Sequence, residues 1–424
     1  MLRRACLLSV TLVIATTANS AHAAGFGIFD ARTLSMGGAS VAAPNSKHAL
    51  FYNPALLAFN EEFEERNLEG RIHFPLIVAQ TSQALIDIEQ FNSDNIDGQL
   101  SQAISSFNAD NTPANAALAA SASSSLRDAL TELAGEDLLA DGYFGFAVAE
   151  PSRLEGGGVF VGMRIIGGGQ TDITAADLAL IDEYVDGLNF IASGGAQGIA
   201  QPQLFDANGN LIDPNAAFDS SLSGRGATIA EVGIAMSKMI SIWGRPVALG
   251  VTPKLMSVET FDGATRLVDD RLGSSMNNLS HMSFNMDLGA AVDIGQRFRV
   301  GVAVKDAIKR EWQTGADTQV VLAPRVRLGA AANVAGLSFA VDLDLNRNDP
   351  IADEFPVREA ALGAEWDFRN WLKFRGGYRH DLEGNRDGIT SFGVGWRIKT
   401  WYIDVGYAKG GNLQAGAIQI SHAI

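Results

Sequence analysis

The chain has 424 residues and carries 48 acidic against 32 basic side chains, which gives a formal net charge of −16. This acidity argues against a nucleic-acid partner, because binding to phosphate backbones requires basic patches. Beyond the amino-terminal signal no run of eighteen apolar residues occurs, which argues against a helical inner-membrane protein, and 45 glycines against 12 prolines without a Pro/Ser-rich linker favour one large β domain.

Residues 1–23 have the layout of a secretory signal peptide. Arg3 and Arg4 precede an apolar stretch that begins at Ala5, and 21–23 is a small-x-small cleavage site. The stretch is too short to be a transmembrane helix, which needs ~20 residues. The only cysteine, Cys6, lies inside it, so we expect the mature protein to contain no disulfide.

Residues 24–62 are rich in small side chains and lack strand alternation, and a charged boundary, Glu61–Arg66, follows at their end. Gly37 and Gly38 allow close approach to a neighbouring backbone, Pro54 fixes its own backbone, and Asn53 can close a turn through its side chain. Tight turns of an ordinary soluble domain would give the same residues, so this segment alone does not decide the fold.

From about Phe284 to the C-terminus, apolar and polar residues alternate with a period of two in an almost unbroken series joined by short turns. Phe284, Met286 and Leu288 share one parity, while Asn285 and Asp287 share the other. Such alternation places the two sets on opposite faces of a sheet, and no helices between the strands cover the apolar face. We therefore predict an all-β fold, a closed antiparallel transmembrane β-barrel of about 14 strands, over residues 63–424. The expected strands are Leu68–Gln80, Gly142–Glu150, Gly157–Ile166, Ala227–Ser237, Pro246–Val258, His281–Ile294, Arg297–Asp306, Thr318–Val334, Leu337–Asn346, Val357–Asp367, Trp371–His380, Ile389–Lys399, Trp401–Lys409 and Asn412–Ile424.

Short turns alternate with long polar connections along this series of strands. The longest connections are 82–141 and 171–224, with helix-forming composition at Ala116–Ala134 and Ala175–Val185. Outer-membrane barrels have short periplasmic turns and longer extracellular loops. We therefore expect both mature termini to lie in the periplasm and both long connections to be extracellular. Glycine runs at 156–158 and 167–169 flank the third strand and predict a bend there.

Two further patterns support a barrel in lipid. Tryptophans fall at strand ends beside short turns, where an aromatic girdle forms at the membrane–water boundary; scattered core tryptophans are the alternative. These are Trp243, Trp366, Trp371, Trp396 and Trp401. Hairpin register can also pair opposite charges on the inward face, either as ladders that satisfy a polar lumen or as sites for a charged solute. The expected pairs are Asp287–Lys305, Asp293–Arg299, Arg327–Asp344, Glu365–Arg375, Asp367–Lys373 and Arg397–Asp404.

No pattern in the chain indicates catalysis, a metal or a cofactor. The mature histidines lack metal-ligand spacing, and no Gly-x-Ser-x-Gly nucleophile motif occurs. His281 and His380 are expected near the extracellular rim, which leaves a lumenal hydrolase as a remote third hypothesis.

The segments 31–42 and 49–58 resemble the start of the FadL-like outer-membrane superfamily, and the overall layout is most similar to its conjugal-transfer TraF-like group. The resemblance implies a fourteen-stranded barrel whose lumen is closed by an amino-terminal hatch. Met36, Gly37 and Gly38 match the Gly-rich turn of that hatch. Asn53, Pro54 and Ala55 match its Asn-Pro-Ala element. In FadL-like channels a hydrophobic solute is caught by extracellular loops and leaves through the wall at a kinked strand. Few aromatics in the long loops and a charged predicted lumen depart from that pattern.

Two functions follow from this sequence. The first is a bacterial outer-membrane channel for passive, hatch-gated passage of a small hydrophobic or amphipathic solute. The second is a structural or docking accessory of conjugation or secretion, with a sealed lumen and a protein partner at its extracellular loops. In either case the other partners are outer-membrane lipid and the cell's barrel-assembly machinery.

Overall fold

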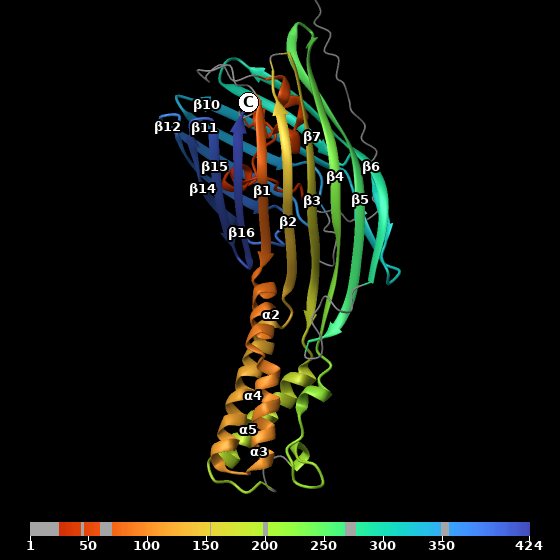
Figure 1. Ribbon diagram of the computed structural model, residues 1–424, viewed down its shortest axis with the longest axis vertical. Helices are drawn as coiled ribbons and strands as arrows, with labels where there is room; N and C mark the ends of the chain where they lie inside the picture. The colour runs from red at the N-terminus through yellow and green to blue at the C-terminus, as the bar shows by residue number, and fades with distance from the viewer. Residues whose placement is uncertain are drawn as a thin grey trace, which may run out of the picture.

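The computed structural model describes residues 25–43, 46–59, 70–152, 154–197, 202–267, 277–348 and 356–424. The expected signal peptide and the charged boundary Glu61–Arg66 lie outside these ranges. Fourteen strands of the described residues close into one antiparallel barrel, which confirms the predicted fold (Figure 1). Helices α2–α5 stand beyond one end of the barrel, here called the helix end. The short connections and the C-terminus lie at the other end, the turn end.

Each barrel strand pairs with its neighbours in sequence, and β1 pairs with β16 to close the barrel. The strands are β1 (Arg71–Ser82), β2 (Asp137–Glu150), β3 (Glu155–Asp172), β4 (Ser221–Ile242), β5 (Arg245–Arg266), β6 (Asn277–Ile294), β7 (Phe298–Lys305), β10 (Arg325–Val334), β11 (Leu337–Asp344), β12 (Glu359–Phe368), β13 (Leu372–Asp381), β14 (Ile389–Ile398), β15 (Trp401–Gly410) and β16 (Leu413–Ala423).

Between β7 and β10 the chain folds into a separate hairpin, β8 (Arg310–Gln313) with β9 (Gln319–Leu322). The strand expected over Thr318–Val334 is therefore wrong in its first part. Pro324 separates β9 from β10, because it has no N–H to donate to a ladder. Trp312 of the hairpin is buried in a cluster with Ile166 and Met256, whose strand parity points into the barrel.

Strands β3, β4 and β5 are longer than predicted. They have 18, 22 and 22 residues, whereas β12–β15 have 10 each. Their helix-end halves contain the glycine-rich segments that the sequence favoured as loops. The register of β3 with β2 runs without a shift from Gly157 to Gln170, and the register with β4 does so from Glu155 to Asp172, so the glycine runs cause no bulge.

The helix end carries a bundle of four helices: α2 (Gln83–Asp94), α3 (Ile96–Ala109), α4 (Pro113–Leu133) and α5 (Ala175–Ala192). Ser82, Thr112 and Thr174 cap α2, α4 and α5 by accepting an N–H three residues on. The apolar faces meet in a core of their own that includes Leu126 and Leu188. The expected helices Ala116–Ala134 and Ala175–Val185 correspond to α4 and α5, whereas α2 and α3 were not predicted. None of the described helices is long and apolar enough to cross a membrane.

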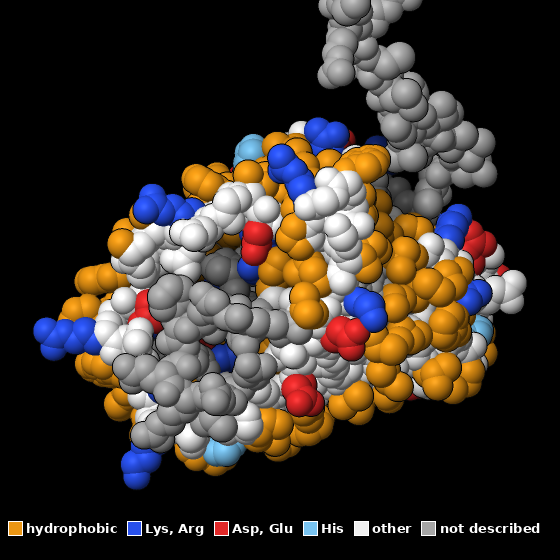
Figure 2. Space-filling model, turned by 90° about the horizontal axis from the view of Figure 1, so that it is seen from above, with side chains coloured by type: hydrophobic (Ala, Val, Ile, Leu, Met, Phe, Trp, Pro, Cys, Tyr) orange, Lys and Arg blue, Asp and Glu red, His pale blue; other side chains and the backbone are white. Residues whose placement is uncertain are grey.

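Large apolar side chains cover the outside of the barrel. Seen end-on in Figure 2, hydrophobic side chains dominate its visible flanks. Outward residues such as Val161 on β3 and Phe339 on β11 are 52% and 44% exposed. The five tryptophans expected in a girdle are all exposed and lie at or beside strand ends, whereas Trp312 is buried. A closed barrel with an apolar exterior, a charged interior and exposed tryptophans is an outer-membrane-type β-barrel.

Candidate functional site

The lumen of the barrel is filled by the amino-terminal part of the chain. This hatch segment comprises residues 25–43 and 46–59, with helix α1 (Ala31–Ser35) and the 3₁₀ turns η1 (Ser46–Phe51) and η2 (Pro54–Ala58). Every side chain from 29 to 43 and from 47 to 59 is buried. Figure 1 shows the segment surrounded by barrel strands.

The residues expected in the hatch shape its turns. Asn53 caps η2 by accepting the Ala55 N–H at 3.1 Å, and its Nδ2 donates to the Val41 carbonyl at 2.8 Å. Pro54 occupies the first position of η2, where its missing N–H costs nothing. Met36 ends α1, and the chain then turns through Gly37 and Gly38 at φ +68° and +93°. That backbone conformation strains any residue with a Cβ.

Inward-facing glycines of the wall receive the hatch segment. A Cβ placed on Gly363 would come within 2.5 Å of the Met36 carbonyl oxygen, and one on Gly301 within 2.9 Å of the Val41 carbonyl oxygen. Several of these glycines are direct cross-strand neighbours. All the inward-facing glycines that contact the hatch segment are together called the glycine seat: Gly156, Gly158, Gly250, Gly289, Gly301, Gly329, Gly363, Gly377, Gly393 and Gly406. This role of the glycines was not predicted from the sequence, although their shared strand parity was a usable signal.

Polar contacts fix the segment within that seat. Asp342 accepts the N–H groups of Ser40 and Val41 at 2.7 and 3.0 Å. Arg32, which is only 1% exposed, donates to Glu365 at 3.0 Å. Buried ionic contacts of this kind depend on both partners, because removal of one leaves the other charge unpaired. The hatch segment is thus bound specifically, by shape and by charge.

Five of the six expected charge pairs lie within ion-pair distance on the inner wall. The N–O distances are 3.1 Å for Lys305–Asp287, 2.7 Å for Arg299–Asp293, 2.5 Å for Arg327–Asp344, 2.6 Å for Arg375–Glu365 and 3.3 Å for Lys373–Asp367. Several of them extend into larger networks. Lys254, for example, contacts Asp287 at 3.0 Å and Asp306 at 2.6 Å, and the sequence analysis did not anticipate this lysine.

The sixth expected pair, Arg397 with Asp404, is wrong. The β14–β15 register places Arg397 opposite Tyr402 and Asp404 opposite Gly395. Asp404 instead binds Arg375 of β13 at 2.6 Å. Gly395 lies between them, and a Cβ there would come within 2.8 Å of the Arg375 Nη2. The absence of a side chain on β14 therefore lets an arginine reach across one whole strand.

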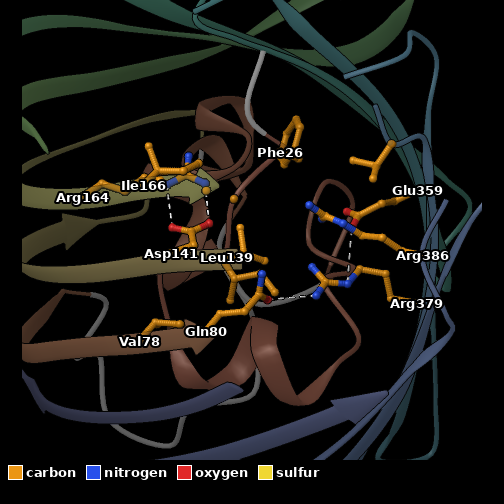
Figure 3. Close-up of a pocket in the computed structure, with 16 residues that line it drawn as sticks. Phe26, Val78, Gln80, Leu139, Asp141, Arg164, Ile166, Glu359, Arg379 and Arg386 are labelled. Atoms are coloured by element: carbon orange, nitrogen blue, oxygen red, sulfur yellow. Dashed lines mark hydrogen bonds and ion pairs between the residues drawn. The ribbon is translucent and has the colours of Figure 1, made fainter. Parts of the chain in front are cut away.

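On the helix-end side of the hatch segment the lumen opens into a cleft, here called the solute cleft (Figure 3). One side holds Arg164, whose guanidinium donates twice to Asp141 at 2.9 and 2.6 Å. On the facing side Arg379 contacts Glu359 at 3.4 Å and donates to Gln80 at 3.1 Å. The apolar lining comes from Phe26, Ile28, Val78, Leu139, Ile166 and Val357. The solute cleft thus combines an oily surface with charged groups of both signs.

A wider vestibule continues from the solute cleft toward the helix end. It has a free volume of about 330 Å³, against about 40 Å³ in the solute cleft, and both are lined by Leu139 and Arg386. Its walls come from the start of β2, from 384–389 and from the β15–β16 turn. The vestibule thus adjoins the solute cleft, which is lined by the first residues of the hatch segment, 25–28.

No metal site accompanies these cavities: within the ranges that the structure describes, no three His, Cys, Asp or Glu side chains are grouped to hold an ion. The two histidines expected near the rim make contacts of another kind. His281 on β6 donates from Nε2 to the Gln313 carbonyl oxygen at 3.0 Å. The His380 ring stacks on the ring of Tyr378, with 6.3 Å between the centroids. Among the described residues, these two histidines thus contact a carbonyl oxygen and an aromatic ring.

Comparison with known proteins gives one family and several distant structures. A family model described as "F plasmid transfer operon, TraF, protein" matches residues 50–344. No curated protein sequence matches the chain. Among solved structures, the toluene transporter TodX of Pseudomonas putida is 10% identical, with 95% of this chain and 98% of that chain covered and a TM-score of 0.46. A Pseudomonas aeruginosa FadL homologue is 11% identical, with 93% and 98% covered and a TM-score of 0.44. The CymD monoaromatic hydrocarbon channel is 10% identical, with 93% and 97% covered and a TM-score of 0.32.

Proposed function

This chain belongs to the family of the TraF protein of the F plasmid transfer operon, and we propose that it is an outer-membrane channel that its hatch segment closes. The solute is a small hydrophobic or amphipathic molecule that enters from the helix end and passes without an energy source. The observation that carries this proposal is the vestibule and the adjoining solute cleft, which lie on the helix-end side of the hatch segment.

The lining of the solute cleft supports an amphipathic solute. Phe26 and Ile166 offer apolar surface, whereas Arg379 and Arg164 offer guanidinium donors within a few side chains of it. Transfer of an apolar group from water onto such a surface is favourable by ~25 cal/mol per Å². A polar head on the same molecule would compete with Gln80 and Glu359 for Arg379. A purely ionic solute would gain nothing from the apolar half.

The glycine seat supports a removable closure. The segment is joined to the wall covalently only through the residues that precede β1, and every other contact is non-covalent. Displacement would expose the glycines and charged side chains of the wall to water. It would also open the apolar cluster in which Phe29 and Phe51 of the hatch segment pack against Phe160 of the wall, so an apolar solute that covers this surface would favour the displaced state. Passage below the solute cleft requires that displacement, because the hatch segment fills the lumen at this level.

The orientation follows from the connections. Short turns are periplasmic in outer-membrane barrels, so the turn end and the C-terminus face the periplasm in this proposal, and the helix bundle faces outward. The outward apolar residues of β4, Val232, Ile234 and Met236, lie in its turn-end half. The helix-end halves of β3–β5 therefore stand outside the hydrocarbon layer. Insertion would require the barrel-assembly machinery, as for other outer-membrane barrels.

Uptake of a hydrophobic tracer into proteoliposomes tests the proposal. We expect little uptake with the full mature chain and rapid uptake after deletion of residues 25–59. Because the deletion could prevent folding, a second variant, Gly377→Ala/Gly393→Ala, disturbs the seat while the chain remains complete. Tracer exclusion by both forms, with the barrel shown to be folded by its heat-modifiable migration, would refute the channel.

The solute cleft needs a separate test. In the Gly377→Ala/Gly393→Ala protein, in which uptake is expected, Arg379→Gln should reduce uptake of an anionic amphipathic tracer more than uptake of an uncharged one. Arg358→Gln is the matched control. Arg358 directly precedes β12, it contacts Glu383 near the surface, and it does not line the solute cleft. Equal effects of the two substitutions would remove the solute cleft from the pathway.

A second function, the docking accessory, is favoured by the composition of the helix end. Residues 83–136 and 173–220 contain fifteen Asp and Glu and one basic residue, Arg127. A projecting domain with this charge would attract basic protein surfaces. If replacement of 83–136 by a short turn abolishes the cellular function but leaves tracer uptake unchanged, docking rather than transport is the function.

A further inference from the structure

Two histidines, here called the histidine pair, meet where the hatch segment contacts the wall. His48 belongs to η1 of the hatch segment and His73 belongs to β1, and their ring centroids lie 5.0 Å apart. Both are buried, with 8% and 1% exposure. A cleft with a free volume of about 40 Å³ is lined by both histidines and by Asn370 of the turn end. A single water needs ~10–15 Å³ on the same measure, so water, and with it a proton, has access to the pair.

The hydrogen bonds of His73 favour its neutral form. Its Nε2 lies 3.0 Å from the Lys47 carbonyl oxygen, which can only accept, so Nε2 carries the ring proton. Its Nδ1 lies 3.1 Å from the Gln419 amide nitrogen, which can only donate, and 2.8 Å from the Ser421 hydroxyl. Nδ1 is therefore an acceptor. A second ring proton would place two donors against each other at Gln419.

His48 is also held neutral while the hatch segment is seated. Its Nδ1 has no hydrogen-bond partner among the residues that the structure describes. The Asp30 carboxylate lies 3.4 Å from this nitrogen, but it already accepts the N–H and the hydroxyl of Thr33 at 2.9 and 3.0 Å. Burial, and after it the charge of Arg32, lower the pKa of His48 to about 3. The neighbouring carboxylate thus does not outweigh the loss of water around a charged ring.

Among the described residues, the other charged side chains that face the histidine pair are lysine, arginine, aspartate and glutamate. The ordinary pKa values of these types lie below about 4.5 or above about 10, whereas that of histidine is about 6.5. They come from the hatch segment, β1 and β12–β15: Asp30, Arg32, Lys47, Arg71, Glu365, Lys373, Arg375, Arg397 and Asp404. The histidine pair is therefore the part of this interface that titrates near neutral pH.

We propose that protonation of the histidine pair releases the hatch segment, so that the closure opens in acid. The inference adds a regulation to the proposed function and rests on it. While the hatch segment is seated both rings are neutral, whereas displacement brings both into water, where histidine gains a proton below about pH 6.5. The displaced state then binds more protons, so its population rises as the pH falls. Reseating would also bring two cationic rings to within 5.0 Å of each other.

The number of protons taken up sets the size of the effect. One histidine that is neutral when seated and ordinary when displaced raises the ratio of displaced to seated protein about 30-fold between pH 7.5 and pH 5.0. Two such histidines multiply to about 900-fold. At neutral pH neither contributes much, so the hatch segment stays seated.

Labelling of a single thiol in the hatch segment tests the proposal on the complete mature protein. Ser40→Cys replaces a side chain that is 5% exposed. Its maleimide labelling rate at each pH is divided by the rate of the urea-unfolded protein, because thiol reactivity itself depends on pH. Between pH 7.5 and pH 5.0 this quotient should rise by up to about 900-fold, by about 30-fold with His48→Gln, and not at all with His48→Gln/His73→Gln. A change in the seating of the hatch segment that is independent of pH cancels in this comparison.

His422→Gln is the matched control. His422 lies at the same end on β16, where it contacts the Thr400 hydroxyl at 3.1 Å and the ring of Trp401, so the acid response should remain. The proposal is overturned if labelling does not rise in acid, or if it rises equally in His48→Gln/His73→Gln. Conductance of the same variants in planar bilayers separates this inference from the channel. Acid release of the thiol without current would support the histidine pair and contradict the channel, whereas current that does not depend on pH would support the channel and overturn the histidine pair.

Discussion

A single methyl group on the inner wall should unseat the hatch segment. Gly377 of β13 faces inward against Met36 and Gly37, and a Cβ at Gly377 would overlap the peptide between them and lie 2.8 Å from the Gly37 Cα. The Gly37 nitrogen and the Met36 carbonyl carbon lie nearer still. Since ordinary contact begins near 3.4 Å, the two backbones must separate by about 1 Å. Its sequence neighbour Gly376 faces the other way, and a Cβ there has its nearest neighbour at 4.0 Å.

The comparison of Gly377→Ala with Gly376→Ala isolates the clash. Both substitutions restrict the unfolded chain equally, an effect of about 0.4–1 kcal/mol, and both lie in the same strand. Overpacking of a tight interface costs about 1–3 kcal/mol. Since 1.4 kcal/mol is a tenfold change in an equilibrium constant, the open population should rise about 5- to 150-fold in Gly377→Ala and remain unchanged in Gly376→Ala.

The assay uses a cysteine placed in the hatch segment. Cys6 is the only cysteine of the chain and lies in the expected signal peptide, so Ser40→Cys introduces a single buried thiol in place of a side chain that is 5% exposed. The rate of maleimide labelling in intact outer membranes reports how often the segment leaves its seat. Equal labelling rates in the two alanine variants would refute the argument that contact with these glycines keeps the segment in place.

Three further substitutions test separate parts of the account. Arg299→Asp should lower the thermal stability of the barrel by about 1 kcal/mol or less, because it turns the 2.7 Å Asp293–Arg299 contact into a repulsion; Asp293→Arg/Arg299→Asp should recover the electrostatic part, and no recovery would contradict the pairing. Asp342→Asn should cost about 1–3 kcal/mol of hatch binding and speed Ser40→Cys labelling, because its carboxylate accepts two hatch N–H groups; unchanged labelling would exclude Asp342 as an anchor. Tyr184→Phe should loosen α5 by about 1 kcal/mol in hydrogen exchange, because the hydroxyl donates to the Ile212 carbonyl at 2.7 Å. Burial raises the pKa of Tyr184, so this contribution should persist at neutral pH and fade only as the pH rises above about 10.

The barrel itself could be predicted because its signal is local. A period of two fixes which side chains face lipid, and short hairpins fix the register between consecutive strands. For that reason Asp293 and Arg299, which flank one turn, were paired correctly. The Arg397–Asp404 prediction failed for two reasons. The two-residue turn Lys399–Thr400 sets a register that moves Asp404 away from Arg397, and Arg375 reaches Asp404 across Gly395 from the next strand. Contacts across an intervening strand leave no hairpin signature.

The helix bundle and the glycine seat were harder to predict. The segment 83–109 has weak apolar periodicity, and its helices α2 and α3 depend on packing against α4 through residues such as Leu100 and Phe107. Glycines in a strand ordinarily indicate a bulge or a bend, and their seat for the hatch segment is a different role. Their role in the wall becomes visible only when the hatch segment is in place. The space beside Gly377, for example, is occupied by Met36 and Gly37, which lie more than three hundred positions away in the chain.

The most direct test of the central claim is a conductance measurement on a hatch that can be locked. Val41 and Gly329 can be cross-linked after a small shift, because a Cβ on Gly329 would lie 2.9 Å from the Val41 Cβ and a disulfide separates these atoms by ~3.5–4.5 Å. The cross-link then holds the shifted segment against the wall. In planar bilayers, the oxidised Val41→Cys/Gly329→Cys protein should be electrically silent, and reduction should produce openings that reoxidation abolishes. If reduction leaves the bilayer silent, and deletion of residues 25–59 from a folded barrel does so as well, then the hatch segment does not close a channel.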